Sequence, residues 1–91
     1  MTKFLQSGRR RDICGLLAGE RLQAQALKSR LEDHYGERLE PKSFYGALDA
    51  LEDSGFVDTE TEGIHDVYVL TEAGEARLRE HYVWLGEQLG E

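Results

Sequence analysis

At Gly55 the spacing of the hydrophobic residues changes from helical to strand-like, and this change most constrains the fold. Before Gly55, the stretch "PKSFYGALDALEDSG" repeats apolar residues at helical spacing, and Pro41 suits the first turn of a helix. After Gly55, "FVDTE" and "HDVYVL" are short and rich in β-branched and aromatic residues, with polar residues around Gly63 between them. This pattern predicts a helix over residues 41–54, followed by a β-hairpin with a tip of about five or six residues.

Two helical stretches precede these elements, and one follows them. "SGRRRDICGLLAG" begins with a cap at Ser7 and ends at Gly19. An extended link around Leu22 leads into "QAQALKSRLEDHYG", whose apolar residues recur every three or four positions. After the hairpin, Thr71 caps a last helix over residues 72–90. With 91 residues the chain is long enough for one domain, residues 1–91, and too short for two.

Two motifs carry a resemblance to a known family. They lie in "PKSFYGALDALEDSGFV" and "VYVLTEAGEARL" and comprise Tyr45, Leu48, Leu51, Glu52, Gly55, Tyr68, Leu70, Thr71 and Gly74. Over residues 9–79 the chain resembles the PadR-like winged-helix regulators. This resemblance implies an α+β fold of the winged helix-turn-helix class, with a three-helix unit, a β-hairpin wing and a C-terminal dimerisation helix.

The resemblance further implies a sequence-specific transcriptional regulator, usually a repressor, that binds duplex DNA as a homodimer. The helix over residues 41–54 would enter the major groove, with its N-terminal residues nearest to the base edges. Lys42 can bind a phosphate or a guanine edge, Ser43 a phosphate or a base, and Tyr45 a phosphate. Gly46 leaves room for close approach to the DNA. The alternatives are a solvated hydroxyl for Ser43 and a half-buried core ring for Tyr45.

Other candidate contacts flank that helix or lie in the wing. Arg9, Arg10 and Arg11 at the start of the first helix, with Gln25 and Lys28 on the second, occupy positions beside the groove in helix-turn-helix docking. Salt bridges to nearby carboxylates are the alternative for the arginines. In the predicted wing tip, "TETEGIHD", His65 is the candidate for a contact in a narrow minor groove, and a solvated loop histidine is the alternative.

The last helix carries the predicted dimer interface. Its apolar side chains exceed what a small domain needs to cover its core, and such a helix usually packs on two bodies. The interface residues are Leu78, Tyr82, Trp84, Leu85 and Leu89. Some PadR-like proteins bind aromatic effectors at this seam, which makes Trp84 a candidate contact for a small aromatic effector. An anchor of the interface is the alternative role for Trp84.

The charge balance opposes DNA binding at low salt. The chain has 18 acidic and 11 basic residues, a net charge of −7, which is the wrong sign for non-specific affinity for DNA. Residues 1–43 hold nine basic and six acidic side chains, whereas residues 44–91 hold two and twelve. Many Asp and Glu with few Lys indicate a halophilic protein, and an ordinary acidic surface is the alternative. At molar salt the Debye length is about 3 Å, so the net negative charge no longer repels DNA at long range. Cations held between carboxylates and phosphates would then permit binding.

The sequence lacks the residue patterns that characterise other classes of function. No metal-ligand spacing and no nucleophile–base motif is formed by the single cysteine and the three histidines, His34, His65 and His81. We therefore expect that the protein is not an enzyme and binds no metal or cofactor. No apolar run approaches the roughly 20 residues of a membrane span, and we expect a cytoplasmic protein. The rival hypothesis is a winged-helix protein-interaction module, whose acidic third helix and wing bind a basic protein instead of DNA.

Overall fold

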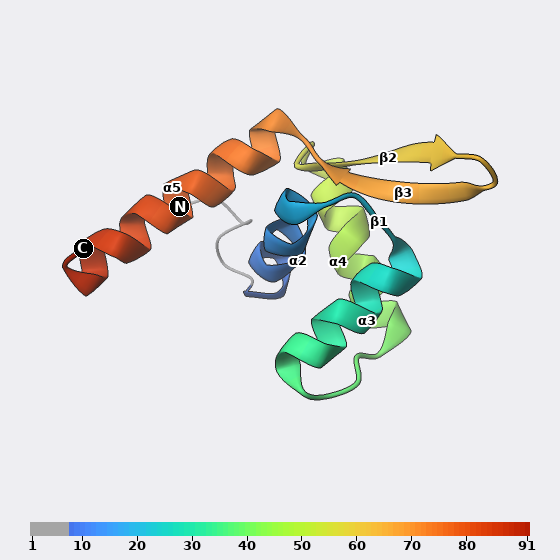
Figure 1. The fold of residues 1–91 in the computed structure, drawn as a ribbon, viewed down its shortest axis with the longest axis horizontal. Coiled ribbons are helices and arrows are strands. Elements are labelled where there is room, and N and C mark those ends of the chain that lie inside the picture. The colour runs from blue at the N-terminus through green and yellow to red at the C-terminus, as the bar shows by residue number, and fades with distance from the viewer. Residues whose placement is uncertain (1–7) are drawn as a thin grey trace.

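The computed structural model describes residues 8–91, and its elements follow the predicted order with one strand added (Figure 1). The helices are Gly8–Gly19 (α2), Ala24–Tyr35 (α3), Pro41–Asp53 (α4) and Glu72–Leu89 (α5). The strands are Leu22–Gln23 (β1), Val57–Glu62 (β2) and His65–Leu70 (β3). The predicted cap, Ser7, lies outside the described residues. Within residues 8–91, no helix combines the length and the apolar composition that crossing a membrane requires.

The core forms where α2, α3 and α4 meet. Their inward faces and the turn between α3 and α4 bury Ile13, Cys14, Leu17, Leu27, Leu31, Leu39, Phe44, Leu48 and Leu51. Burial raises the pKa of the Cys14 thiol to about 12, so this side chain packs as a small neutral group. The helical spacing of these apolar residues therefore sets which face of each helix points inward, and which face is left for function.

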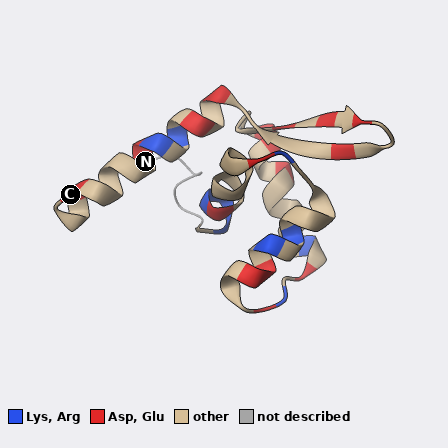
Figure 2. Ribbon diagram, viewed as in Figure 1, with Lys and Arg blue, Asp and Glu red and all other residues tan. Residues whose placement is uncertain are grey.

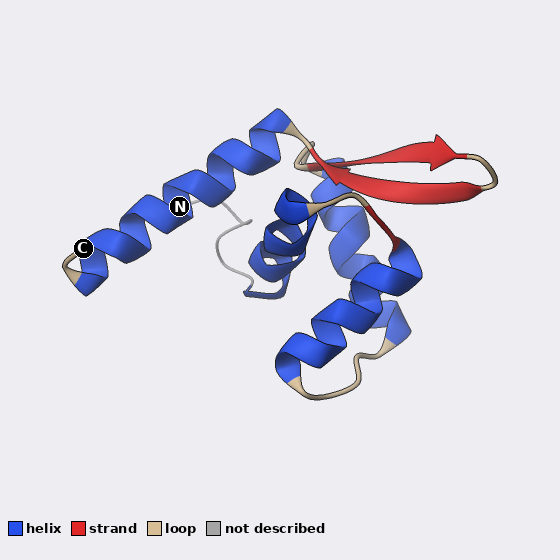
Figure 3. Cartoon of the chain, viewed as in Figure 1, coloured by secondary structure: helices blue, strands red, loops and turns tan. Residues whose placement is uncertain are grey.

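The sheet differs from expectation in two ways. The link at Leu22 is a short strand that pairs with β3, so β3 is the central strand in the order β1-β3-β2 (Figure 3). The predicted tip of five or six residues is wrong, because pairing continues to Glu62 and His65 and leaves a two-residue turn. The alternating Thr and Glu residues extend β2 beyond its predicted end, since β-branched threonines favour the extended backbone. Gly63, with φ of 65°, takes the first turn position, as a type II′ hairpin turn favours.

Two hydrogen bonds of Thr71 and the close packing of Gly74 form a joint between the end of the sheet and α5. The Thr71 side-chain oxygen accepts the N–H of Gly74 at 3.1 Å, which confirms the predicted cap, and the Thr71 hydroxyl donates to the carbonyl of Gly55 at 2.6 Å. A Cβ at Gly74 would lie 2.6 Å from a methyl carbon of Leu70 and closer still to the carbonyl oxygen of Phe56. Glycine is therefore required at position 74, because the neighbouring atoms leave no space for a Cβ. The joint sets the direction in which α5 leaves the helical body, opposite to the wing of β2 and β3 (Figure 1).

Candidate nucleic-acid interface

Helix α4 presents its first turns to solvent. Phe44 is buried and anchors the helix, while Lys42, Ser43 and Gly46 are exposed on the outer side. Tyr45 is 39% exposed and lies edge-on to Phe44, with the ring centres 5.2 Å apart. The half-buried interpretation of Tyr45 and the solvent-facing one therefore both apply, since the ring packs while part of the side chain stays exposed. Nothing lies within 4 Å of a Cβ built on Gly46, so the helix surface there is open to an approaching molecule.

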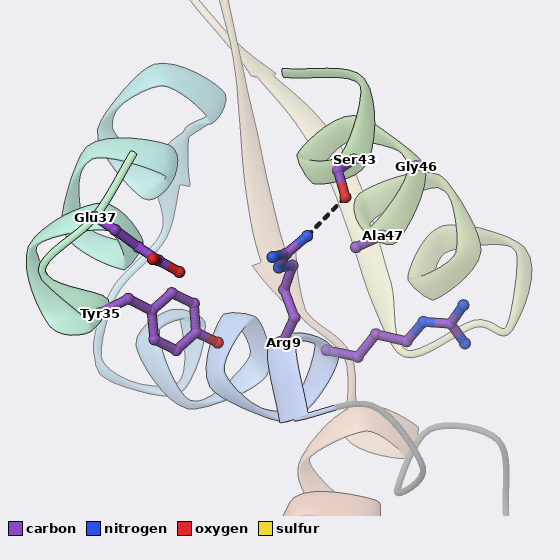
Figure 4. Close-up of a pocket in the computed structure, with 7 residues that line it drawn as sticks. Arg9, Tyr35, Glu37, Ser43, Gly46 and Ala47 are labelled. Atoms are coloured by element: carbon purple, nitrogen blue, oxygen red, sulfur yellow. Dashed lines mark hydrogen bonds between the residues drawn. The ribbon is translucent and has the colours of Figure 1, made fainter. Parts of the chain in front are cut away.

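A hollow brings together four of the predicted DNA contacts. Arg9, at the start of α2, donates a hydrogen bond from Nη1 to Oγ of Ser43 at 2.7 Å. The hollow is lined by Arg9, Arg10, Tyr35, Glu37, Ser43, Gly46 and Ala47. In Figure 4 the Arg9 side chain extends between the side of α3 that carries Tyr35 and the side of α4 that carries Ser43. Arg11 follows on the same helix and is partly buried.

A second hydrogen bond fixes the position of Tyr35, which lines this hollow. The Tyr35 hydroxyl donates to Oδ2 of Asp12 at 2.5 Å, joining the end of α3 to the first turns of α2. Burial, helped by the bond to Asp12, raises the pKa of Tyr35 to about 12. The phenol therefore keeps its proton and continues to donate at physiological pH. This contact keeps the Arg9 end of α2 close to the turn that leads into α4.

Gln25 and Lys28 line a different hollow, on α3. Gln25 is exposed, whereas Lys28 pairs with Glu32 one turn later, with Nζ and Oε2 at 3.0 Å. The same oxygen of Glu32 accepts the backbone N–H of Leu39 at 2.8 Å. The bond from Leu39, with the contribution of Lys28, lowers the pKa of the Glu32 carboxyl. Lys28 thus supports the turn between α3 and α4 in the structure, and any phosphate contact would compete with this ion pair.

The wing is acidic and is tied to the helical body by Arg21, a residue that no motif in the sequence singles out. Its guanidinium pairs with Glu60 and, at 2.9 Å, with Glu62. His65 is exposed beside the turn, and Ile64 at the turn is 93% exposed. The wing tip therefore presents an apolar residue and an imidazole, where winged-helix proteins often present Arg or Lys.

The junction between α4 and the wing is also negative. Burial raises the pKa of Tyr68 on β3, and the nearby Glu52 and Asp49 of α4, then Tyr45 and Asp66, add to the shift. In Figure 2, blue segments lie on α2, α3 and α5, and red bands recur along the wing. The surface beside the start of α4 therefore combines Arg9 and Arg10 with Glu37, whereas the wing is acidic.

Helix α5 carries a large apolar surface. Leu78 packs against the core, but four of the predicted interface residues remain exposed: Tyr82 by 78%, Trp84 by 49%, Leu85 by 42% and Leu89 by 66%. His81 stacks on Trp84, with the ring centres 5.8 Å apart. Hollows along this helix are lined largely by its own residues, and one is shared with Ala18 of α2. A helix with this much exposed apolar surface has the form of an interface to a second body.

Residues 13–80 match the family described as "Transcriptional regulator PadR-like family". The structure is similar to RosR of H. salinarum, at 26% identity and a TM-score of 0.83, over 90% of this chain and 76% of that one. It is also similar to the homodimeric winged helix-turn-helix DNA-binding domain of Mb0332 from Mycobacterium bovis, at 27% identity and a TM-score of 0.75, covering 96% and 76% of the two chains.

A third structure, TA0346 of Thermoplasma acidophilum, shares the fold at 23% identity and a TM-score of 0.75, over 97% of this chain and 90% of that one. No curated protein sequence matches the chain. The predicted winged helix-turn-helix fold and the resemblance to PadR-like regulators are confirmed. Since the family is one of transcriptional regulators, the expectation that the chain is not an enzyme is confirmed as well.

Proposed function

The chain belongs to the PadR-like family of transcriptional regulators, and on this premise we propose that it is a repressor that binds specific duplex DNA as a homodimer. In this proposal, α4 enters the major groove and its first turns meet the base edges. Lys42 and Ser43 make the first contacts, Tyr45 reaches a phosphate through its hydroxyl, and Gly46 permits close approach.

The hydrogen bond between Arg9 and Ser43 carries the proposal. It joins two predicted DNA contacts that lie 34 residues apart in the sequence, on the open surface where Arg10 and Gly46 also lie. A phosphate seated there would receive charge-assisted hydrogen bonds from arginine while Ser43 faces the groove. The basic start of α2 and the exposed start of α4 thus form one continuous surface, which supports a duplex lying across both.

The exposed side chains of α5 support the homodimer. Tyr82 and Leu89 are more than half exposed in the single chain, and a partner helix packed on them would remove this apolar surface from water. Mb0332, similar at 27% identity, is described as a homodimeric DNA-binding domain. A two-fold dimer would place the two α4 helices in successive major grooves about 34 Å apart, so the operator should be palindromic.

The charge distribution supports binding in strong salt. Asp49 and Glu52 lie beside Tyr68, on the junction between α4 and the wing, where they would repel phosphates in dilute buffer. At molar salt the Debye length of about 3 Å confines this repulsion to direct neighbours. Affinity should therefore fall less steeply with salt than the usual counterion-release slope, or rise with it. The similarity to RosR of H. salinarum is consistent with a halophilic protein.

Selection of random duplex DNA by the purified protein in molar KCl tests the proposed function. We expect enrichment of a palindrome whose half-sites are one helical turn apart, and Lys42→Glu should abolish its binding. Gly15→Ala serves as a control that should bind like the wild type, because Gly15 is exposed on α2, does not line the Arg9 hollow, and has nothing within 4 Å of an added Cβ. Failure to enrich any sequence at any salt would refute DNA recognition.

The carboxylates around Tyr68 favour one second candidate, a module that binds a basic protein surface. Such binding would weaken steadily as salt rises, because screening removes the attraction. Lys42→Glu separates the two functions, since it adds negative charge at the same surface. It should abolish operator binding, but leave binding of a basic partner unchanged or tighter.

A further inference from the structure

Arg21 lies at the point where the helical body meets the sheet. It immediately precedes β1, in the link between α2 and α3, and its side chain is 49% exposed. Nη2 pairs with Oε1 of Glu60, and Nη1 pairs with Oε2 of Glu62 at 2.9 Å. Both terminal nitrogens of the guanidinium therefore face carboxylates of the wing, in the forked arrangement that arginine favours and lysine cannot reproduce.

These ion pairs cross the whole sheet. β1 and β2 are the outer strands, on opposite sides of β3, so Arg21 joins the two strands that share no backbone hydrogen bonds. Glu60 pairs in register with Val67, and Glu62 with His65, so both carboxylates project from the same face of the hairpin. The wing is otherwise a long two-stranded ribbon, which twists and bends easily without such a brace.

The ion pairs also change the charge of the wing. β2 carries Asp58, Glu60 and Glu62, and β3 adds Asp66. A wing with this charge repels a phosphate backbone, and a guanidinium held between two of the carboxylates offsets part of that repulsion. Because its terminal nitrogens are directed at Glu60 and Glu62, Arg21 is placed to act on DNA through the wing and not by binding a phosphate itself.

We propose that Arg21 is a positioning residue for DNA binding, which braces the acidic wing against the helical body and offsets Glu60 and Glu62. This inference rests on the proposed function for its effect on DNA affinity. The bracing itself is a property of the free protein and can be measured without DNA.

A mutant cycle tests the effect on DNA, at the lowest salt at which the wild type binds an enriched duplex. Arg21→Gln should weaken binding about fivefold, because the wing loses its brace and Glu60 and Glu62 are left to repel the phosphates. In a Glu60→Gln/Glu62→Gln background, the same substitution should change affinity by no more than about twofold, because only one charge is then lost and no ion pair remains that braces the wing. A fivefold loss that persists in this background would mean that Arg21 binds DNA directly, and would overturn the proposal.

Arg77→Gln is the charge control. It removes one positive charge from an exposed ion pair with Glu80 on α5, and should leave DNA affinity within about twofold. Arg21→Lys adds a finer test, because it keeps the charge but loses the fork. The proposal predicts an affinity between those of the wild type and Arg21→Gln, whereas an affinity as low as that of Arg21→Gln would contradict the charge-offsetting role.

A distance measurement tests the brace in the free protein. Spin labels at Ile64→Cys on the wing turn and Ala26→Cys on α3, in labelled protein diluted with an excess of unlabelled protein, report the wing's position within one chain, while buried Cys14, with its raised pKa, stays unlabelled. Arg21→Gln should broaden the distance distribution, and Arg77→Gln should not. Identical distributions for Arg21→Gln and the parent would overturn the brace. This readout separates the two proposals, since a wild type that binds no duplex refutes only the proposed function.

Discussion

Replacing Gly74 by alanine tests the physical basis of the motif that starts α5. Gly74 is buried three residues after the cap at Thr71, and an added Cβ would lie 2.6 Å from Leu70 and closer to the backbone carbonyl of Phe56. That carbonyl accepts the N–H of Thr71 at 3.1 Å, so it cannot move away without breaking the joint. The added methyl group must therefore push α5 away from the end of the sheet.

Overpacking of this kind costs about 1–3 kcal/mol, and contact with backbone favours the upper part of that range. Alanine recovers up to about 1 kcal/mol through its better helix propensity. The net loss of about 1–2 kcal/mol should lower the melting temperature by about 5–15 °C for a domain of this size. Thermal unfolding followed by far-UV circular dichroism measures it, at equal protein concentration because the proposed dimer would make the melting temperature depend on concentration.

Gly15→Ala is the matched control for this experiment. Gly15 is exposed on α2 and nothing lies within 4 Å of a Cβ built there, so alanine should raise the melting temperature by about 4 °C. The reasoning would be refuted by a Gly74→Ala protein that melts at or above the wild-type temperature. It would equally be refuted if both substitutions had the same effect, because close approach would then play no part.

Three further substitutions follow from the same contacts. Gly46→Ala should raise the melting temperature by about 4 °C yet weaken operator binding about tenfold, since the methyl group occupies space left for DNA; fluorescence anisotropy measures the affinity. Glu32→Gln should destabilise the protein most above pH 4.5, the ordinary pKa of Glu32. Because the folded-state pKa is lowered, the difference in melting temperature from wild type should shrink as pH falls through it. Trp84→Ala should raise the dimer dissociation constant about tenfold or more, as measured by sedimentation, and an unchanged value would place the interface elsewhere.

Most of the fold could be predicted from the sequence because its signals are local. The spacing of apolar residues, Pro41, and the cap at Thr71 each act within a few residues of the chain, and the structure places the helices accordingly. The strand at Leu22 could not be predicted, since two residues carry no periodicity and become a strand only by pairing with β3. The short wing turn was mispredicted because polar Thr and Glu residues resemble a loop until their alternation is weighed.

The contacts between the candidate DNA-binding residues could not be predicted from the sequence. Arg9 and Ser43 were both expected to contact DNA, and their hydrogen bond depends on the packing of α2 against α4. Lys28 and Glu32 lie four residues apart, so their ion pair could have been inferred from helix geometry. The pairing of Arg21 with Glu60 depends on the register of three strands, and no local signal in the sequence indicates it.

In the proposed function, this acidic winged-helix protein recognises DNA as a dimer through α4. Sedimentation velocity of the protein mixed with an enriched duplex in molar KCl measures both the recognition and the number of chains bound. The prediction is a complex of one duplex with two 10.3 kDa chains, which Lys42→Glu abolishes while its unfolding temperature stays near that of the wild type. Separate sedimentation of protein and duplex at every salt concentration, or a complex unaffected by Lys42→Glu, would contradict it.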